Sequence, residues 1–358
     1  MASRRLWNLF GHRYKLSVYR FSDHHIALAC KFFSGIGYYG PVLEPISTLL
    51  HQGNHPMKKF KWIATLAATA AVIIISCKTE FETTKADYRS IKSQEALVRG
   101  KELAFSICAG CHYDRTVNKF IGTQILDVPG IAGKVYSANL THSQSRGVTA
   151  KYTDAEIRHL LKTGVARNGR YLSYMLRPNM AEEDINAIIV YLRSDDPTLA
   201  AADTTVGLTH FTFIGKIFMN AHAKPVPYKT GVKLPADKVA MGYYLVDNLG
   251  CFHCHSKSLT KLNYLNPDQT KGYLAGGMKM KGEKGVDVRA SNITPDKMTG
   301  IGNYSEDQFR IALTDGQAPD RALKPPMPKF NKLKSGEIDA IYAYLRTVPP
   351  VRNNVKGM

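Results

Sequence analysis

Two copies of the pattern Cys-x-x-Cys-His constrain this chain more than any other feature of its 358 residues. The first copy reads CAGCH at residues 108–112, and the second reads CFHCH at residues 251–255. A zinc site built from two CxxC pairs needs four thiolates, usually at short spacing, yet these pairs lie far apart. A redox dithiol also uses CxxC. Neither interpretation explains a histidine directly after each second cysteine.

The pattern C-x-x-C-H is typical of covalent attachment of a c-type haem. Two thiols about one helical turn apart can add to the two vinyl groups of one porphyrin. The next side chain can then place an imidazole nitrogen on the iron. The sequence therefore predicts two covalently attached haem c groups. The predicted attachment residues and histidine ligands are Cys108, Cys111 and His112 in the first copy, and Cys251, Cys254 and His255 in the second.

Residues 57–77 have the features of an export signal. Lysines follow Met57, and an apolar run from Trp62 to Ser76 is too short for a comfortable transmembrane span. The run ends in IISC, which resembles the lipobox of bacterial lipoproteins and predicts acylation of Cys77. An uncleaved anchor helix is the alternative. Both interpretations predict an exported, periplasmic protein that is attached to the membrane, through a lipid anchor in the first case.

Residues 1–56 precede this signal and show no clear periodicity, so we expect translation to begin at Met57. Residues 78–92 are polar and are expected to form a tether. The formal charge of +19 could suggest nucleic acid, but nine Lys/Arg and only two Asp/Glu lie in residues 1–61. Haem propionates would offset part of the remainder. We therefore expect no nucleic-acid partner, but a basic surface suited to an acidic redox partner.

An internal repeat follows the two motifs. Residues 138–164 read ANLTHSQSRGVTAKYTDAEIRHLLKTG, and residues 291–316 read SNITPDKMTGIGNYSEDQFRIALTDG. In the alignment Asn139 matches Asn292, Thr141 matches Thr294, Tyr152 matches Tyr304 and Gly164 matches Gly316. A helix is predicted to begin in each copy, with Thr153 and Ser305 as N-caps. A local Asx turn is the simple interpretation of the two asparagines.

Amphipathic helices frame each repeat. Both EEDINAIIVYLRS and GEIDAIYAYLRT place apolar residues at i, i+3, i+4 and i+7. Helices are also predicted before each CxxCH motif, with Gly100 and Gly242 in their middle. Glycine is costly there unless a second helix approaches closely. Tyr191 and Tyr344, on the last helix of each repeat, are the expected partners.

These patterns predict an all-α chain with two small helical domains in tandem, each built around one covalent haem. We expect the first domain at residues 93–195 and the second at residues 236–350. Residues 196–235 form a linker that is long for a plain loop. It either wraps one domain or contains a short helix, and the sequence leaves both open.

The iron's sixth ligand is predicted to be a methionine in each domain. Met327 lies in KPPMPKF, where prolines stiffen an extended loop. Met175 lies almost as far before the last helix of its domain as Met327 does, only one residue closer. Met180 lies much nearer to that helix, so Met175 is favoured over Met180. His142 and His159 are alternatives for bis-histidine ligation. Methionine ligation raises the reduction potential relative to bis-histidine.

The CxxCH motifs, the downstream methionine and the terminal helix with its tyrosine resemble class I cytochrome c, in tandem. The run from Ser291 to Gly316 resembles dihaem cytochromes associated with membrane dehydrogenases. The resemblance implies an electron carrier, not an enzyme, between a dehydrogenase or other donor and a respiratory acceptor such as a cytochrome or oxidase. A dihaem cytochrome c peroxidase is the alternative, and it requires an iron with an open site. A methionine in each domain argues against it.

Overall fold

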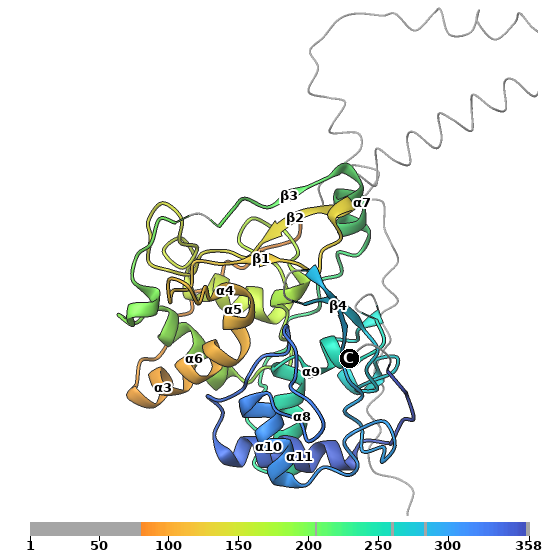
Figure 1. Ribbon diagram of the computed structural model, residues 1–358. Helices are drawn as coiled ribbons and strands as arrows, with labels where there is room; N and C mark the ends of the chain where they lie inside the picture. Colours follow the sequence, from red (N-terminus) through yellow and green to blue (C-terminus); the bar gives the residue numbers. More distant parts are fainter. Residues whose placement is uncertain (1–79, 205, 259–260, 283–284, 356–358) are drawn as a thin grey trace, which may run out of the picture. The chain divides into compact units, whose positions relative to one another are not determined.

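The computed structural model describes residues 80–204, 206–258, 261–282 and 285–355, which belong to one compact unit. The predicted leader with Cys77 and residues 1–56 lie outside the described residues, as do residues 78–79 of the tether. The described chain is mostly helical, with small sheets (Figure 1). Within it, no helix has the length and apolar character needed to cross a membrane.

The first CxxCH motif ends a continuous helical segment. Helix α3 (Gln94–Leu103) runs through a π-helical turn (Ala104–Cys108) into α4 (Ala109–His112). The Ser93 side chain caps the start of α3 by accepting a hydrogen bond from the amide of Ala96. The motif is therefore held at the carboxyl end of a helix whose other end is capped.

Helix α3 packs against α6 (Glu182–Leu192) at the predicted glycine. A Cβ atom added at Gly100 would lie 1.9 Å from the carbonyl oxygen of Ala187 and 2.8 Å from the Cβ of Tyr191. Real Cβ atoms do not approach so closely, so only glycine allows this crossing. The predicted partnership of Gly100 and Tyr191 is confirmed.

The second repeat uses the same crossing. Helix α8 (Lys238–Asn248) packs against α11 (Ser335–Thr347). A Cβ at Gly242 would lie 2.0 Å from the carbonyl oxygen of Ala340 and 2.6 Å from the Cβ of Tyr344. Helix α9 (Cys251–His255) then carries the second CxxCH motif. Figure 1 shows α8 and α11 side by side.

The predicted N-caps are confirmed in both repeats. Thr153 begins α5 (Asp154–Thr163) and Ser305 begins α10 (Glu306–Asp315), each within a capping box. Both helices end at a glycine with positive φ, 77° at Gly164 and 74° at Gly316.

The apolar faces of the terminal helices fill two separate cores. Ile185, Ile188 and Ile189 of α6 are at most 2% exposed, as the i, i+3, i+4 pattern predicts. Ile338, Ile341 and Leu345 of α11 occupy the same place in the second core. Ile107, one residue before Cys108, packs against both cores.

The all-α prediction is correct only in part, because short strands occur in the loops after each motif. One sheet has the order β1 (Gln124–Ile125), β2 (Gly133–Tyr136), β3 (His210–Phe211), and the other pairs β4 (Lys279–Lys281) with β5 (Asp287–Arg289). All the pairings are antiparallel. Strands of two to four residues are too short to produce a readable alternation in sequence. Single 3₁₀ turns occur at Gly130–Ala132, Ser173–Met175, Pro197–Leu199 and Pro267–Gln269.

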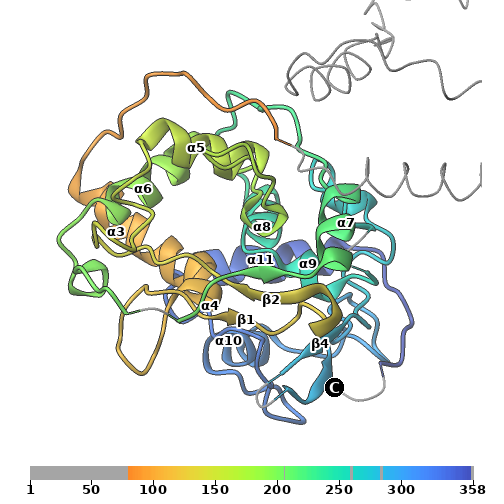
Figure 2. The same ribbon diagram turned by 90° about the horizontal axis from the view of Figure 1, so that it is seen from above.

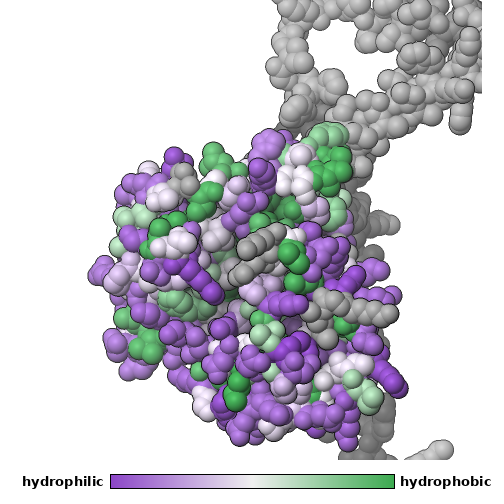
Figure 3. All heavy atoms as spheres, in the orientation of Figure 1, coloured by the Kyte–Doolittle hydropathy of each residue, from purple (hydrophilic) through white to green (hydrophobic). Residues whose placement is uncertain are grey.

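The linker satisfies both alternatives left open by the sequence. It adds β3 to the first repeat's sheet and then forms helix α7 (Phe213–Ala221), next to the end of β2 in Figure 2. A Cβ at Gly215 would lie 1.9 Å from the carbonyl oxygen of Ala132, so α7 packs closely against the 3₁₀ turn at Gly130–Ala132. Phe213, Ile214 and Phe218 remain exposed, and apolar residues gather over α7 in Figure 3.

Candidate haem-binding sites

The two motif histidines are buried and held in the same way. The Nδ1 atom of His112 lies 2.7 Å from the carbonyl oxygen of Ala138, and that of His255 lies 2.7 Å from the carbonyl oxygen of Ser291. A carbonyl only accepts, so Nδ1 must carry the proton. In the neutral ring this leaves the lone pair of Nε2 available for a metal ion.

Burial lowers the pKa of both imidazoles, which favours this neutral form, while the hydrogen bond to the carbonyl raises it by a smaller amount. The backbone around each histidine is fixed as well. The amide of Gly122 donates to the carbonyl of His112 at 2.9 Å, and the amide of Gly276 donates to that of His255 at 2.6 Å. Both glycines have positive φ, 88° and 72°. The local arrangement is thus repeated down to the backbone.

The four motif thiols are free. Burial raises the pKa of Cys108 and Cys251 to about 12 and that of Cys254 to about 11. Reactive dithiols depend on a lowered thiol pKa, which these surroundings disfavour. In the part of the chain that the structure describes, no three His, Cys, Asp or Glu side chains are grouped to hold a metal ion. The zinc and dithiol interpretations therefore lose support, whereas free thiols beside an available imidazole suit haem c.

The asparagines of the repeat form Asx turns, which was the simple interpretation of these residues. Asn139 Oδ1 accepts from the amide and hydroxyl of Thr141 at 2.8 and 2.7 Å. Asn292 does the same for Thr294 at 3.0 and 2.8 Å. Each turn also fixes the carbonyl just before it, which is the acceptor for the motif histidine.

Ala138 and Ser291 were not predicted from the sequence, because they act through backbone carbonyls. The signal that could have identified them is their position directly before the repeated Asn-x-Thr. The asparagine side chains extend this support to the ends of the repeats. Asn139 Nδ2 donates to the carbonyl of Ala202 at 2.8 Å, and Asn292 Nδ2 donates to that of Val351 at 2.7 Å.

The methionine loops of the two repeats align on backbone hydrogen bonds. The amides of Leu172 and Leu323 donate to the carbonyls of Gly164 and Gly316, both at 2.7 Å. Met175 follows Leu172 by three residues, and Met327 follows Leu323 by four. The first loop is therefore one residue shorter.

The methionine side chains differ in exposure. Met175 and Met327 are half-buried at the edges of their cores. Met180 is fully buried within the first core. Its carbonyl also accepts a hydrogen bond from Nζ of the buried Lys162 at 2.6 Å. Met175 thus lies within one residue of the loop position of Met327 and is similarly buried, whereas Met180 matches it in neither respect.

The two alternative histidines already have structural contacts. His142 Nε2 lies 3.0 Å from the carbonyl oxygen of Leu192. The ring of His159 stacks on Tyr228 with the ring centroids 6.2 Å apart. These contacts favour packing roles for both.

Side chains from the two repeats meet in a polar contact. Arg99 of α3 lies 2.9 Å from an oxygen of Asp184 and 2.6 Å from an oxygen of Glu337, which belongs to α11. The Tyr244 hydroxyl of α8 donates to the other oxygen of Asp184 at 2.6 Å. The cation and both carboxylates are therefore mutually satisfied.

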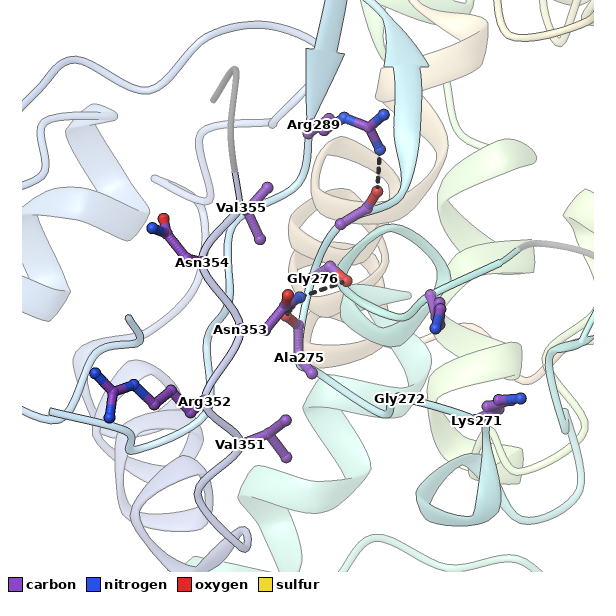
Figure 4. Close-up of a pocket in the computed structure, with 12 residues that line it drawn as sticks. Lys271, Gly272, Ala275, Gly276, Arg289, Val351, Arg352, Asn353, Asn354 and Val355 are labelled. Carbon is purple, nitrogen blue, oxygen red and sulfur yellow. Dashed lines mark hydrogen bonds between the residues drawn. The ribbon is translucent and has the colours of Figure 1, made fainter. Parts of the chain in front are cut away.

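A basic surface pocket of about 610 Å³ lies on the second repeat (Figure 4). It is lined by Gly272, Ala275, Gly276 and Gly277 and by the tail after α11, from Val351 to Val355. Among the described residues that line it, four side chains are cationic and none is acidic. The cations are Lys257, Lys271, Arg289 and Arg352.

Comparisons with known proteins identify the relatives of this chain. No known protein-family profile matches it. The chain is 27% identical over 315 residues to the fructose dehydrogenase cytochrome subunit of Gluconobacter japonicus, covering 82% of this chain and 60% of that protein. It is 27% identical over 278 residues to the gluconate 2-dehydrogenase cytochrome c subunit of Pantoea cypripedii, covering 72% and 60%.

A third relative is the cytochrome c subunit of alcohol dehydrogenase (quinone) from Gluconacetobacter polyoxogenes, 23% identical over 262 residues, covering 68% of this chain and 54% of that protein. The chain thus spans about 60% of the length of the first two relatives. Its homologues are cytochrome subunits of dehydrogenases, electron carriers and not catalytic subunits. They imply covalently bound haem c, and the resemblance to such cytochromes is confirmed to that extent.

Proposed function

We propose that this chain is a dihaem c-type cytochrome that passes electrons from a dehydrogenase partner to a respiratory acceptor. The observation that carries the proposal is the repeated arrangement of free thiols beside a buried histidine whose Nε2 is available. The names of its relatives support the dehydrogenase as donor. Haem c, when bound, supplies an iron that alternates between the ferric and ferrous states.

The chain's own residues would hold and tune each group. The paired cysteines of each motif form the covalent attachment, and His112 and His255 ligate through Nε2. Ala138 and Ser291 keep the imidazole rings in position through their carbonyls. Met175 and Met327 would supply the second protein ligand of each iron, which would close both sites to small molecules. The basic pocket and surface suit an acidic redox partner.

A peroxidase is the competing function, and it needs an iron with an open or displaceable ligand. We expect the half-reduced protein to show no enzyme-like turnover when mixed with hydrogen peroxide in a stopped-flow instrument. Both sites should remain low-spin, because each repeat supplies its own sixth ligand. Rapid turnover, or a high-spin signal on half-reduction, would contradict the electron-carrier proposal.

The choice of Met175 is tested by its optical signature. The oxidised protein should show the weak sulfur-to-iron charge-transfer band near the red end of the visible spectrum. Met327→Ala should remove about half of that band, and Met175→Ala the other half. Met180→Ala serves as the matched control and should leave the band intact, although it costs about 2–5 kcal/mol of stability as a buried truncation. Loss of the band in Met180→Ala instead would reverse the assignment.

We also propose that the mature protein is periplasmic and anchored to the membrane through an acylated Cys77. The support is the IISC sequence after a basic and apolar leader. Cys77→Ser is expected to block lipid modification and processing, which membrane fractionation and intact mass would show. A variant that remains on the membrane with the mass of the parent protein would place the anchor elsewhere.

A further inference from the structure

Arg177 reaches from the methionine loop of the first repeat to the second CxxCH motif. Its amide donates to the carbonyl of Leu161 at 2.6 Å, which fixes its backbone on the first repeat. Its Nε donates to the carbonyl of Asn248, the last residue of α8, at 2.9 Å. A Cβ added at Gly250 would lie 3.5 Å from Nη2. The guanidinium therefore lies beside the residue that immediately precedes Cys251.

The hydrogen-bond partners of this guanidinium are backbone carbonyls. In addition to the bond from Nε to Asn248, Nη1 donates to the carbonyl oxygen of Leu176 at 2.8 Å and to that of Tyr174 at 3.2 Å. No carboxylate of a described residue forms an ion pair with it within 4.0 Å. Burial lowers the pKa of Arg177, but an arginine keeps its proton at neutral pH. Its full positive charge is thus held in place without a directly paired anion.

The guanidinium lies between the two repeats. Arg177 follows Met175, the predicted ligand of the first site, by two residues, and its side chain reaches Asn248 and the space beside Gly250, directly before the second motif. One fixed charge therefore lies close to parts of both sites.

We propose that Arg177 is a fixed charge shared by the two haem sites, which raises the reduction potential of both haems. This inference rests on the proposed function. Reduction lowers the charge of an iron centre by one, so a nearby positive charge stabilises the reduced state. The effect is strong where burial lowers the effective dielectric constant. A single side chain would then keep the two potentials high together, which suits transfer of electrons from one haem to the other.

The test is a spectroelectrochemical redox titration of the full chain loaded with haem. Arg177→Gln should make reduction of each haem less favourable by about threefold to tenfold, where tenfold corresponds to about 59 mV for one electron. The titration is done well above the pKa of Asp247, which burial raises to about 6, so that this neighbouring carboxylate is ionised. Arg177 is partly buried, so high salt should reduce the shift less than it would for a surface charge.

Arg99→Gln is the matched control. Arg99 also joins the two repeats, but Asp184 and Glu337 neutralise it. It should shift neither potential by as much as Arg177→Gln. Equal shifts in the two variants would mean a loosened contact between repeats and would overturn the proposal. A shift confined to the first haem, or accompanied by loss of its charge-transfer band, would mean a displaced Met175 loop and would also overturn it.

Arg177→Lys keeps the proposal testable if the glutamine variant does not mature. Lysine retains the charge, so both potentials should stay near those of the parent protein. A fall in the two reduction potentials as large as that expected for Arg177→Gln would overturn the proposal. Haem quantitation separates this outcome from failure of the proposed function, because a parent protein without two haems would refute the dihaem assignment before any potential is measured.

Discussion

Gly242→Ala is expected to destabilise the protein by about 3 kcal/mol or more, although alanine is the better helix former. The added methyl group would lie 2.0 Å from the Ala340 carbonyl and 2.6 Å from the Cβ of Tyr344. Both obstacles belong to the backbone or to its first side-chain atom, so neither can rotate away. Helices α8 and α11 would have to separate along their whole contact. Thermal or denaturant unfolding, followed by circular dichroism, measures the loss.

Gly336→Ala provides the control within the same pair of helices. Gly336 lies in the first turn of α11, and a Cβ added there would meet no atom of the described chain within 4 Å. Alanine at this position should be neutral or stabilising by up to about 1 kcal/mol. Gly100→Ala should repeat the loss in the first repeat, where Ala187 is the obstacle. Equal effects at Gly242 and Gly336 would show that helix propensity, and not the close crossing, decides stability here.

The helical framework could be predicted because its determinants are local side chains. Thr153 and Ser305 indicate where two helices begin, because their side chains can accept hydrogen bonds from the first helical turn. Gly100 and Gly242 stood out because glycine at mid-helix has a cost that the chain must offset elsewhere. Repetition in the second half made each signal more specific.

Other features depend on contacts that a sequence does not display. The carbonyls of Ala138 and Ser291 are present in any residue, so the support of the motif histidines could not be assigned from residue type. Helix α7 was one of two alternatives that the sequence left open for the linker, and its position against Ala132 depends on a backbone contact that residue type does not display. Arg177 reads as an ordinary loop arginine until the second repeat is placed beside it.

Loss of one complete haem is the largest functional change that we expect from substitution. Cys108→Ser combined with Cys111→Ser should lower the covalent haem content from two per chain to one, as measured by pyridine haemochrome on denatured protein. The reason is that serine hydroxyls do not form the thioether bonds. The same pair of changes at Cys251 and Cys254 should remove the other haem, and all four together should remove both.

Ser256→Ala is the control for a disturbance near the second motif, because Ser256 is fully buried directly after His255 and its hydroxyl has no hydrogen-bond partner among the described residues. It should keep both haems. A four-serine variant that retains covalent haem would exclude the motifs as attachment sites. Zinc in the parent protein in place of haem, detected by elemental analysis, would restore the metal-thiolate interpretation. Two haems in the parent, one in each double variant and two in Ser256→Ala would assign one group to each motif, since no other pattern of attachment yields that set of values.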